Sequence, residues 1–475
     1  MACHGHHRHG FMAGCFERSV ATRVGLLGLS GRQCAVDCVG RAHRIVGPGR
    51  VAAVLDRDEH PWCREEPRVN ESASPMWRNA APAHRALELV VVVPVRDEAV
   101  DLIKTLRSLA LQRGLDGAPL DKSKFEVLLL ANNCTDDSAN LAREFAHLSA
   151  NFALHVAEVA LPPADAHIGH VRRLLMDEAC CRLQKVNRLQ GIVASTDGDT
   201  TADPYWLAHM REEFSLGVDA VGGRIVLDPR AQLDAATLRR HRCDEAYRLA
   251  LSKLESLVDP DFADPWPRHH QHFGANLAVN REAYLKVGGV PAVRYLEDEA
   301  LVTAFRRADM RVRHSPHVRV MTSPRYDGRV EVGLSWQLRQ WQAKPAAVEL
   351  MVEDPHWARL QFQARRCLRE EWRRSGDARW KASAKALGRW LNVPEAWLTE
   401  TATASKTFGA LWQQVLERKH LQVPTPQLPI RRASEQLRAL IRAHKETPLS
   451  ASGARPAASA GSASLTARVE RSHVQ

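Results

Sequence analysis

The stretch Gly191-Ile-Val-Ala-Ser-Thr-Asp-Gly-Asp-Thr200 places two carboxylates one residue apart, directly after a short apolar run. The apolar run predicts a buried strand, and the polar residues predict a loop at its carboxyl end. In open α/β sheets, ligands bind beyond the carboxyl ends of the strands. Asp197 and Asp199 could share a hard divalent cation there, because carboxylate oxygens suit Mg²⁺ and Mn²⁺. Gly198 would let the backbone approach a ligand closely.

The chain around this stretch alternates between predicted strands and helices. Apolar runs at residues 87–93, 125–130, 152–159 and 191–195 predict four strands. Helices are expected over about residues 98–113, over the segment that carries Leu141, Phe145 and Leu148, and from Ile168 onward with Val171, Leu174, Leu175 and Ala179 facing inward. Asp97 is the expected N-cap of the first helix. This alternation predicts a doubly wound α/β domain.

Outside residues 85–330 the pattern changes. Residues 1–84 are rich in His, Arg, Gly and Cys without sustained periodicity, which indicates a disordered segment or a start site assigned upstream of Met76. The alternative is that His4, His6, His7 and His9 bind a transition metal. Residues 331–445 carry Trp, Arg, Leu and Ala at helical spacing, which predicts an α-helical extension. Residues 446–475, rich in Ala, Ser and Gly, predict a disordered tail.

Composition narrows the class of protein. The net charge of +11 suits an anionic partner such as a nucleotide diphosphate, a membrane surface or nucleic acid, and it also suits a basic surface without a specific partner. No apolar run approaches the roughly 20 residues of a membrane span, and no signal peptide is recognisable. The ten cysteines show no paired CxxC spacing. Reduced thiols in a cytoplasmic protein are therefore expected.

Two further segments could carry chemistry. Glu297-Asp298-Glu299 precedes the helical stretch at residues 300–305, where acidic side chains also suit the helix dipole. In the functional interpretation, Asp298 is a general base that deprotonates a hydroxyl group. The segment Phe273-Gly-Ala-Asn-Leu-Ala-Val279 combines small residues with an amide, as a wall closely approached by a sugar would need. The alternative is a strand edge with a glycine bulge.

The order of these segments resembles glycosyltransferase family 2, an inverting family with the GT-A fold. The resemblance covers roughly residues 87–330, about half of the chain. It is carried by Val92-Val-Pro-Val-Arg-Asp-Glu98, Leu129-Leu-Ala-Asn-Asn-Cys-Thr-Asp-Asp-Ser138, the Asp197-Gly-Asp199 triplet, His272-Phe-Gly-Ala-Asn276, and Gly288-Gly-Val-Pro291 followed by Glu297-Asp298. The family's opening strand, second acidic motif, DxD, acceptor-side segment and base-carrying element occur in this order.

The resemblance implies a role for each matching residue. Pro94, Arg96 and Glu98 would line the nucleotide pocket, Asn132 would lie near the base, Arg172 close to the nucleotide, and Asp197 at the ribose or indirectly at the metal. Asp199 would bind Mn²⁺ or Mg²⁺, and Asp298 would be the catalytic base. A later histidine often completes the metal site in this fold, and either His317 or His314 could serve.

Three features depart from the family pattern or stand outside it. Ala131 and Asn132 replace an acidic pair that often reads uracil, so a uridine donor is not implied. Gln337-Leu-Arg-Gln-Trp341 has the residue types of the processive QxxRW motif with Arg one position early, which predicts an amphipathic helix in a non-processive enzyme. The run Thr322-Ser-Pro-Arg-Tyr-Asp-Gly-Arg329 could close over a diphosphate or form a solvated turn.

The expected activity is therefore transfer of a sugar, with inversion, from a nucleotide-sugar donor to an acceptor hydroxyl on a saccharide, lipid or small molecule. A nucleotidyltransferase is a second hypothesis, although the loop at residues 94–98 lacks the glycines that class usually needs. A third is a protein that binds membrane surfaces or nucleic acid through Arg365, Arg366, Arg369, Arg373, Arg374 and Trp372. A solvated helix face with Glu370 and Glu371 is preferred for that cluster, which disfavours nucleic acid and leaves peripheral membrane contact open.

Overall fold

A computed structural model of the chain describes residues 75–230, 233–328, 332–373, 380–420 and 424–446. Nearly all of the N-terminal segment and tail, including the four histidines near the N-terminus, therefore lie outside the described residues. Five of the ten cysteines are described, and all five are free thiols. Among the described residues, no helix has the length and apolar character that crossing a membrane requires.

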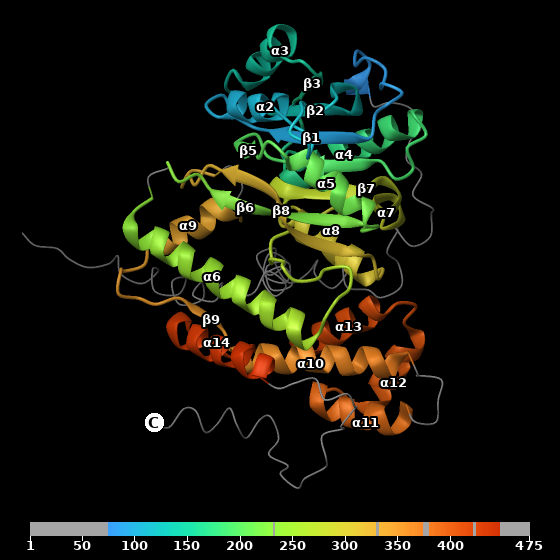
Figure 1. Ribbon diagram of the computed structural model, residues 1–475, viewed down its shortest axis with the longest axis vertical. Coiled ribbons are helices and arrows are strands. Elements are labelled where there is room, and N and C mark those ends of the chain that lie inside the picture. The colour runs from blue at the N-terminus through green and yellow to red at the C-terminus, as the bar shows by residue number, and fades with distance from the viewer. Residues whose placement is uncertain (1–74, 231–232, 329–331, 374–379, 421–423, 447–475) are drawn as a thin grey trace, which may run out of the picture.

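An eight-stranded mixed sheet forms the centre of the molecule (Figure 1). Its strands are β1 (Leu89–Val95), β2 (Phe125–Asn132), β3 (Ala153–Val159), β4 (Ile192–Ser195), β5 (Thr200–Ala202), β6 (Ala220–Leu227), β7 (Leu277–Asn280) and β8 (Val312–Thr322), in the spatial order β3-β2-β1-β4-β7-β6-β8-β5. The strands β1 to β4 are mutually parallel where they pair, β7 is antiparallel to β4 and β6, and β8 is parallel to β6 and antiparallel to β5.

Successive residues of β1 serve opposite faces of the sheet, as the two-residue period of a strand requires. Leu89, Val91 and Val93 belong to one core, which they share with α2 (Leu102–Ala110), α3 (Ser138–Leu148) and α5 (Trp206–Ser215). Val90 and Val92 belong to the other, with α4 (Ile168–Lys185), α7 (Arg281–Lys286) and α8 (Glu297–Arg307). The expected α/β class, with helices on both faces of a mixed sheet, is confirmed.

Two local predictions need correction. The first helix begins at Leu102 with Asp101 as its N-cap residue, because Asp97 instead adopts a φ of +53° and accepts hydrogen bonds from the backbone of Thr135 and Asp136. Leu174 of α4, which is expected to face inward, is only partly buried.

Strand direction brings four distant loops to one edge of the sheet. The parallel strands β1, β2 and β4 end at this edge, and antiparallel β7 begins there, with Leu277 opposite Ser195. The short helix η4 (Gly274–Asn276) therefore lies beside the end of β4. Because Thr200 of β5 pairs with Thr322 of β8, the loop after β8 starts next to Asp199.

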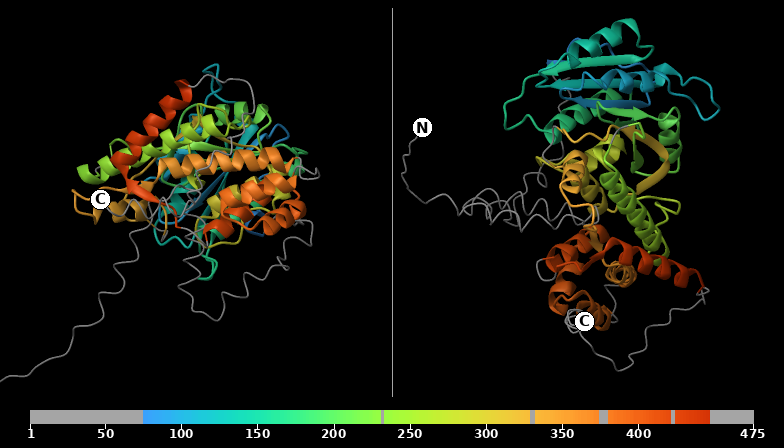
Figure 2. Two further views of the ribbon diagram at one scale, coloured as in Figure 1. Left: turned by 90° about the horizontal axis from the view of Figure 1, so that it is seen from below. Right: turned by 90° about the vertical axis from the view of Figure 1, so that its left-hand side faces the viewer.

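The chain beyond β8 is largely helical, as expected, and includes α9 (Leu334–Gln342), α10 (Pro355–Trp372), α11 (Trp380–Leu391), α12 (Glu395–Ala404), α13 (Phe408–His420) and α14 (Ile430–Glu446). It also contains a short antiparallel pair, β9 (Met351–Glu353) and β10 (Gln427–Pro429), that was not expected. The helices α10 to α14 lie at the opposite end of the molecule from β1–β3, whereas α9 lies nearer the sheet, against the long helix α6 (Ala235–Val258) (Figures 1 and 2).

The arginines of α10 were expected on a solvated helix face, and the structure corrects this for two of them. Arg365 and Arg369 both reach the carboxylate of Asp259, which is fully buried, and Arg365 also pairs with Glu255 at 2.9 Å. Arg366 does pair with Glu370 on the solvent side, at 3.0 Å. Arg365 and Arg369 therefore attach α10 to α6 and are not available to bind a polyanion.

Candidate active site

Arg172, on the first half of α4, joins two of the acidic motifs. Its side chain is 3% exposed. Its Nε donates to Ser195 Oγ at 3.1 Å, its Nη2 pairs with Asp197 Oδ1 at 2.8 Å, and its Nη1 pairs with Glu297 Oε1. The triplet after β4 and the acidic segment at the start of α8, 100 residues apart in the chain, are thus held by a single guanidinium. Arg172 lies beneath these carboxylates, where it supports them from the protein interior.

Asp298, the predicted base, lies at the start of α8 in a half-buried position. Its Oδ2 accepts a hydrogen bond from the backbone N–H of Gly274 at 2.7 Å, and its Oδ1 accepts one from Glu299 N at 2.7 Å. A side chain at Gly274 would place a Cβ 2.2 Å from Arg172 Nη1. Glycine is therefore required for η4 to pack on Arg172 and still orient the Asp298 carboxylate.

Glu297 is buried against Arg172. Burial raises the pKa of its carboxyl to about 7, although the Arg172 charge opposes this rise and the nearby Asp298 charge adds to it. The pKa of Glu297 therefore depends on the charges of Arg172 and Asp298. The contact between Glu297 and Arg172 also fixes the first turn of α8, which carries Asp298.

Asp199 lies in a cluster of opposite charges at the carboxyl edge of the sheet. Burial and the neighbouring Asp197 raise the pKa of its carboxyl to about 7. Arg325 Nη2 lies 2.9 Å from Asp199 Oδ2 and 2.5 Å from Glu98 Oε1. Hard divalent cations bind carboxylate oxygens at sites of net negative charge. The carboxylates of Asp199 and Glu98 therefore fit Mn²⁺ or Mg²⁺.

The predicted nucleotide-pocket residues of the first loop take different positions. Pro94 is buried within β1, whereas Arg96 is exposed and donates to the carbonyl of Ala166 at 3.4 Å. Glu98 is 8% exposed, its backbone N–H donates to Ser138 Oγ at 2.8 Å, and its side chain packs on Gly198. Of the three, Glu98 is the one that the structure brings directly to the Asp199 cluster.

Asn132 is the last residue of β2 and is 4% exposed. Its Oδ1 atom is buried and has no hydrogen-bond partner among the described residues. A buried polar atom without a partner is unfavourable unless a ligand or water supplies one. At the carboxyl end of β2, Asn132 Oδ1 could therefore accept a hydrogen bond from a ligand or a water.

The two histidines considered as a metal ligand lie elsewhere. His317 is exposed on β8, with its ring 5.5 Å from the ring of His209 on α5. His314 is buried, with its Nδ1 2.7 Å from Asp264 Oδ2 and its Nε2 3.1 Å from His272 Nδ1. Asp199 is instead contacted by Arg325, an arginine from the loop after β8.

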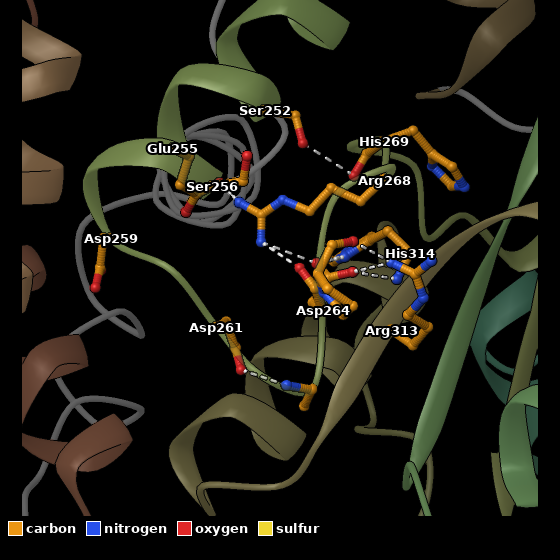
Figure 3. A network of polar contacts seen from close by, with 12 residues as sticks. Ser252, Glu255, Ser256, Asp259, Asp261, Asp264, Arg268, His269, Arg313 and His314 are labelled. Carbon is orange, nitrogen blue, oxygen red and sulfur yellow. Dashed lines mark hydrogen bonds and ion pairs between the residues drawn. The ribbon is translucent and has the colours of Figure 1, made fainter. Parts of the chain in front are cut away.

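A buried polar network surrounds His314 (Figure 3). Asp264 accepts hydrogen bonds from His314 Nδ1, Arg268 and Arg313. Burial favours the neutral form of its carboxyl, but the contacts with His314 and Arg268 outweigh burial and hold the pKa of Asp264 well below its usual range. Burial lowers the pKa of His314 to about 4, so its ring is neutral near pH 7. A neutral His314 that donates through Nδ1 must accept through Nε2, which orients His272.

His272 connects this network to the segment that carries the predicted base. Its Nδ1 donates to His314, and its Nε2 lies 2.5 Å from Glu299 Oε2. One proton must occupy the contact between His272 and Glu299, either on the ring or on the carboxyl. Because Glu299 follows Asp298 directly, the network fixes the first turn of α8 from behind.

Some site features were missed or misassigned from the sequence. Asn276, expected on a wall for a sugar, is fully buried and hydrogen-bonds to Trp206 Nε1, to the Arg224 carbonyl and to the Val318 carbonyl. Among the described residues, one group of three potential ligands has atoms within 4.8 Å of one another, and it consists of Asp97, Cys134 and Asp136. Asp97 Oδ1 accepts three hydrogen bonds from residues 135 and 136, which indicates a structural link between the first two loops.

No known protein-family profile matches the chain, and no curated protein sequence matches it. Among solved structures, the chain is similar to the mannosyltransferase PcManGT from Pyrobaculum calidifontis in complex with GDP-Man and Mn²⁺, with 18% identity over 87% of this chain and 97% of that chain and a TM-score of 0.36. It is also similar to S. aureus TarS 1–349 in complex with UDP-GlcNAc, with 13% identity over 71% of this chain and 92% of that chain and a TM-score of 0.36.

Proposed function

We propose that residues 85–330 form a GT-A-type domain that transfers a sugar, with inversion, from a nucleoside-diphosphate sugar to an acceptor hydroxyl. The observation that carries this proposal is the convergence of the two acidic motifs. Arg172 pairs with Asp197 and with Glu297, and Asp298 is oriented by the N–H of Gly274. A cation-binding triplet and a general base that share one edge of a sheet can act on the two sides of one glycosidic centre.

The residues of the chain divide into a leaving-group side and an acceptor side. On the leaving-group side, Asp199 would hold a divalent cation, with Asp197 beside it. When bound, that cation supplies charge stabilisation to a departing diphosphate. On the acceptor side, Asp298 accepts the proton of the attacking hydroxyl. The hydrogen bonds from Gly274 N and Glu299 N orient the Asp298 carboxylate for this transfer.

The nucleoside would lie at the ends of β1 and β2. Asn132 offers a buried acceptor oxygen there that has no partner among the described residues. An N–H group on the edge of a nucleobase would satisfy this oxygen, and the amide accepts a wider set of bases than a carboxylate does. The proposal therefore leaves the base open while placing its polar edge at Asn132.

A panel of nucleotide sugars tests the proposal on the full chain. Thermal unfolding is measured for each compound with and without Mn²⁺, and the donor is expected to raise the Tm only when the cation is present. With that donor, Asp199→Asn and Asp298→Asn are each expected to reduce sugar transfer by about 100-fold or more while the protein stays folded. Full activity in either folded variant would contradict the assignment.

Two product measurements separate this function from its alternatives. The anomeric configuration of the product, followed by NMR, is expected to be opposite to that of the donor. Pyrophosphate release from a nucleoside triphosphate and a sugar phosphate would favour the nucleotidyltransferase hypothesis instead. Nucleoside diphosphate release in step with glycoside formation would exclude that hypothesis.

A further inference from the structure

Arg325 lies where a cation of the Asp199 cluster would be expected. Its Nη2 is 2.9 Å from Asp199 Oδ2 and 2.5 Å from Glu98 Oε1, so one nitrogen serves two carboxylates. The three side chains are 25%, 14% and 9% exposed for Arg325, Asp199 and Glu98, respectively. This is a partly desolvated contact between a permanent cation and two acidic groups from different loops.

The position of Arg325 follows from the register of the sheet. Thr200 pairs with Thr322, and their hydroxyl oxygens lie 3.4 Å apart, so the residues after Thr322 emerge beside Asp199. The next residue in the loop, Tyr326, donates from its hydroxyl to Asp234 Oδ2 at 2.8 Å. The Tyr326 carbonyl accepts a hydrogen bond from Arg339 of α9. The backbone next to Arg325 is therefore fixed, while its side chain reaches the cluster from outside.

We propose that Arg325 occupies the cation position between Asp199 and Glu98 until the donor binds, and that its guanidinium then moves to the diphosphate as a divalent cation takes its place. This inference rests on the proposed function. The exchange makes the cation and the diphosphate bind cooperatively. The cation replaces Arg325 at the two carboxylates, and the diphosphate replaces the carboxylates as the ionic partner of Arg325.

The charges of the site support this exchange. A divalent cation bound at Asp199 would lie close to the guanidinium of Arg325, and two cations at such a separation repel each other strongly in a partly buried site. A diphosphate brings several negative charges and oxygen atoms that match the planar fork of a guanidinium. Arg325 can therefore leave Asp199 and Glu98 with little loss of favourable electrostatic energy only when phosphate oxygens are present.

The expected thermodynamic signature is reciprocal coupling between the two ligands. In the wild-type protein, Mn²⁺ alone competes with Arg325 and binds weakly, whereas Mn²⁺ with a nucleoside diphosphate binds tightly. By linkage, the diphosphate gains as much affinity from Mn²⁺ as Mn²⁺ gains from the diphosphate. An uncharged residue at position 325 removes the competitor, so the coupling should shrink because Mn²⁺ alone binds better.

The test measures Mn²⁺ binding without any turnover. Free Mn²⁺ is followed by its EPR signal in titrations of the full chain, alone and with UDP or GDP, after correction for the complex that Mn²⁺ forms with the diphosphate in solution. Arg325→Gln is expected to bind Mn²⁺ alone about 10-fold more tightly than the wild type, and its coupling to the diphosphate is expected to fall by about the same factor.

Matched variants identify the cause of this change. Arg325→Lys keeps the charge and should keep most of the coupling. Arg319→Gln removes one positive charge from an exposed position on β8, the strand that precedes the Arg325 loop, and should behave as the wild type. Asp199→Asn should abolish Mn²⁺ binding in both backgrounds, which assigns the site.

The outcomes separate the inference from the proposed function. If Arg325→Gln binds Mn²⁺ alone no better than the wild type while Asp199→Asn still abolishes binding, the exchange is wrong and the metal site stands. If the wild type and Arg325→Gln bind neither Mn²⁺ nor any nucleotide sugar, the proposed function fails and the inference fails with it.

Discussion

Arg172 shows how one side chain can make two distant motifs act as a unit. Its three nitrogens are directed at Ser195, Asp197 and Glu297, and the side chain is almost completely buried. A guanidinium makes several hydrogen bonds in one plane, whereas an ammonium group is a single point charge. Arg172 is therefore a positioning residue, since it acts on the reaction through the carboxylates that it holds.

Replacing Arg172 by lysine should keep the charge and lose the geometry. We expect kcat for the donor to fall by about 100-fold, because displacements of about 1 Å in a catalytic constellation have effects of that size. The KM for the donor should change much less. Steady-state kinetics measure kcat and KM separately and so test this prediction. If Arg172 had only a structural role, the substitution would lower the fraction of folded enzyme and leave the pH profile of the transfer reaction unchanged.

Arg173→Lys is the matched control for that substitution. Arg173 is the next residue of α4, and its guanidinium donates to the carbonyls of Val290 and Gly288 rather than to the site carboxylates. Its variant should keep the wild-type pH profile. An Arg172→Lys enzyme with wild-type kcat would show that the two motifs are aligned without this residue.

The pH dependence of stability should reflect the buried His314. Its pKa is lowered to about 4 by burial, against the opposing effect of Asp264, while His272, His269 and Arg306 also face it. The unfolded chain therefore binds more protons than the folded protein between about pH 6.5 and pH 4. We expect the free energy of unfolding to fall across this window, by at most about 3 kcal/mol from this group.

Urea denaturation at a series of pH values measures that slope. His314→Gln should be less stable at pH 7 and should show a flatter dependence between pH 6.5 and pH 4. The exposed His317→Gln is the control and should leave the slope unchanged. An identical slope in the wild type and His314→Gln would mean that other groups cause the acid sensitivity.

At the scale of the element, the sequence predicted strands and loop positions well and side-chain partners poorly. The β-branched run at residues 87–93 became β1 because both faces of a central strand are buried, and this leaves an unmistakable apolar signal. Asp97 lost its expected capping role because Thr135, from another loop, competes for its carboxylate. This competition arises because two loops lie close together in space, and a local sequence pattern does not predict that proximity.

Strand register explains the difference between the expected and observed partners of Asp199. The resemblance implies a later histidine as metal ligand and leaves His314 and His317 open. In the structure, His314 pairs with Gly222 of β6 and His317 lies in the register shift that follows, whereas Arg325 comes after the end of β8 and contacts Asp199. The antiparallel pairing of β5 with β8 was not predicted, and it determines which residues approach the triplet.

Gly274 gives an element-scale prediction, because η4 packs directly on Arg172. In Gly274→Ala the new Cβ would lie 2.2 Å from Arg172 Nη1, so the turn or the arginine must move. We expect a loss of about 1–3 kcal/mol in the free energy of unfolding and a drop in kcat of at least about 10-fold, since the N–H that orients Asp298 moves with the turn.

Ala275→Ser tests the same turn without the clash. Residue 275 is the middle residue of η4 and is partly exposed, so the substitution should have little effect on either quantity. Thermal or urea unfolding gives the stability, and the transfer assay gives kcat. Wild-type activity in Gly274→Ala would remove Gly274 from the positioning of the base.

At the scale of the whole molecule, the C-terminal helices contact both α6 and α8 of the proposed catalytic domain. Arg365 and Arg369 of α10 attach to Asp259 at the end of α6. The N-terminus of α13 docks on the end of α8, where Asp309 accepts hydrogen bonds from Phe408 N at 2.8 Å and Gly409 N at 2.7 Å. The helix that begins with the Asp298 segment is therefore supported at its far end by α13.

This second contact predicts that the C-terminal helices influence the reaction through α8. Asp309→Ala removes the cap of α13 and places alanine at a φ of +52°, so it should lower the free energy of unfolding by about 2 kcal/mol. Because α8 loses its support, kcat should fall several-fold in addition.

Asp354→Ala is the matched control, since Asp354 caps α10 through His356 N at 2.8 Å without touching α8. It should lower the free energy of unfolding by about 1 kcal/mol, through the loss of the cap alone, and leave kcat unchanged. Equal kcat values in the two variants would mean that the helical extension supports the fold of the chain and has no part in aligning the base.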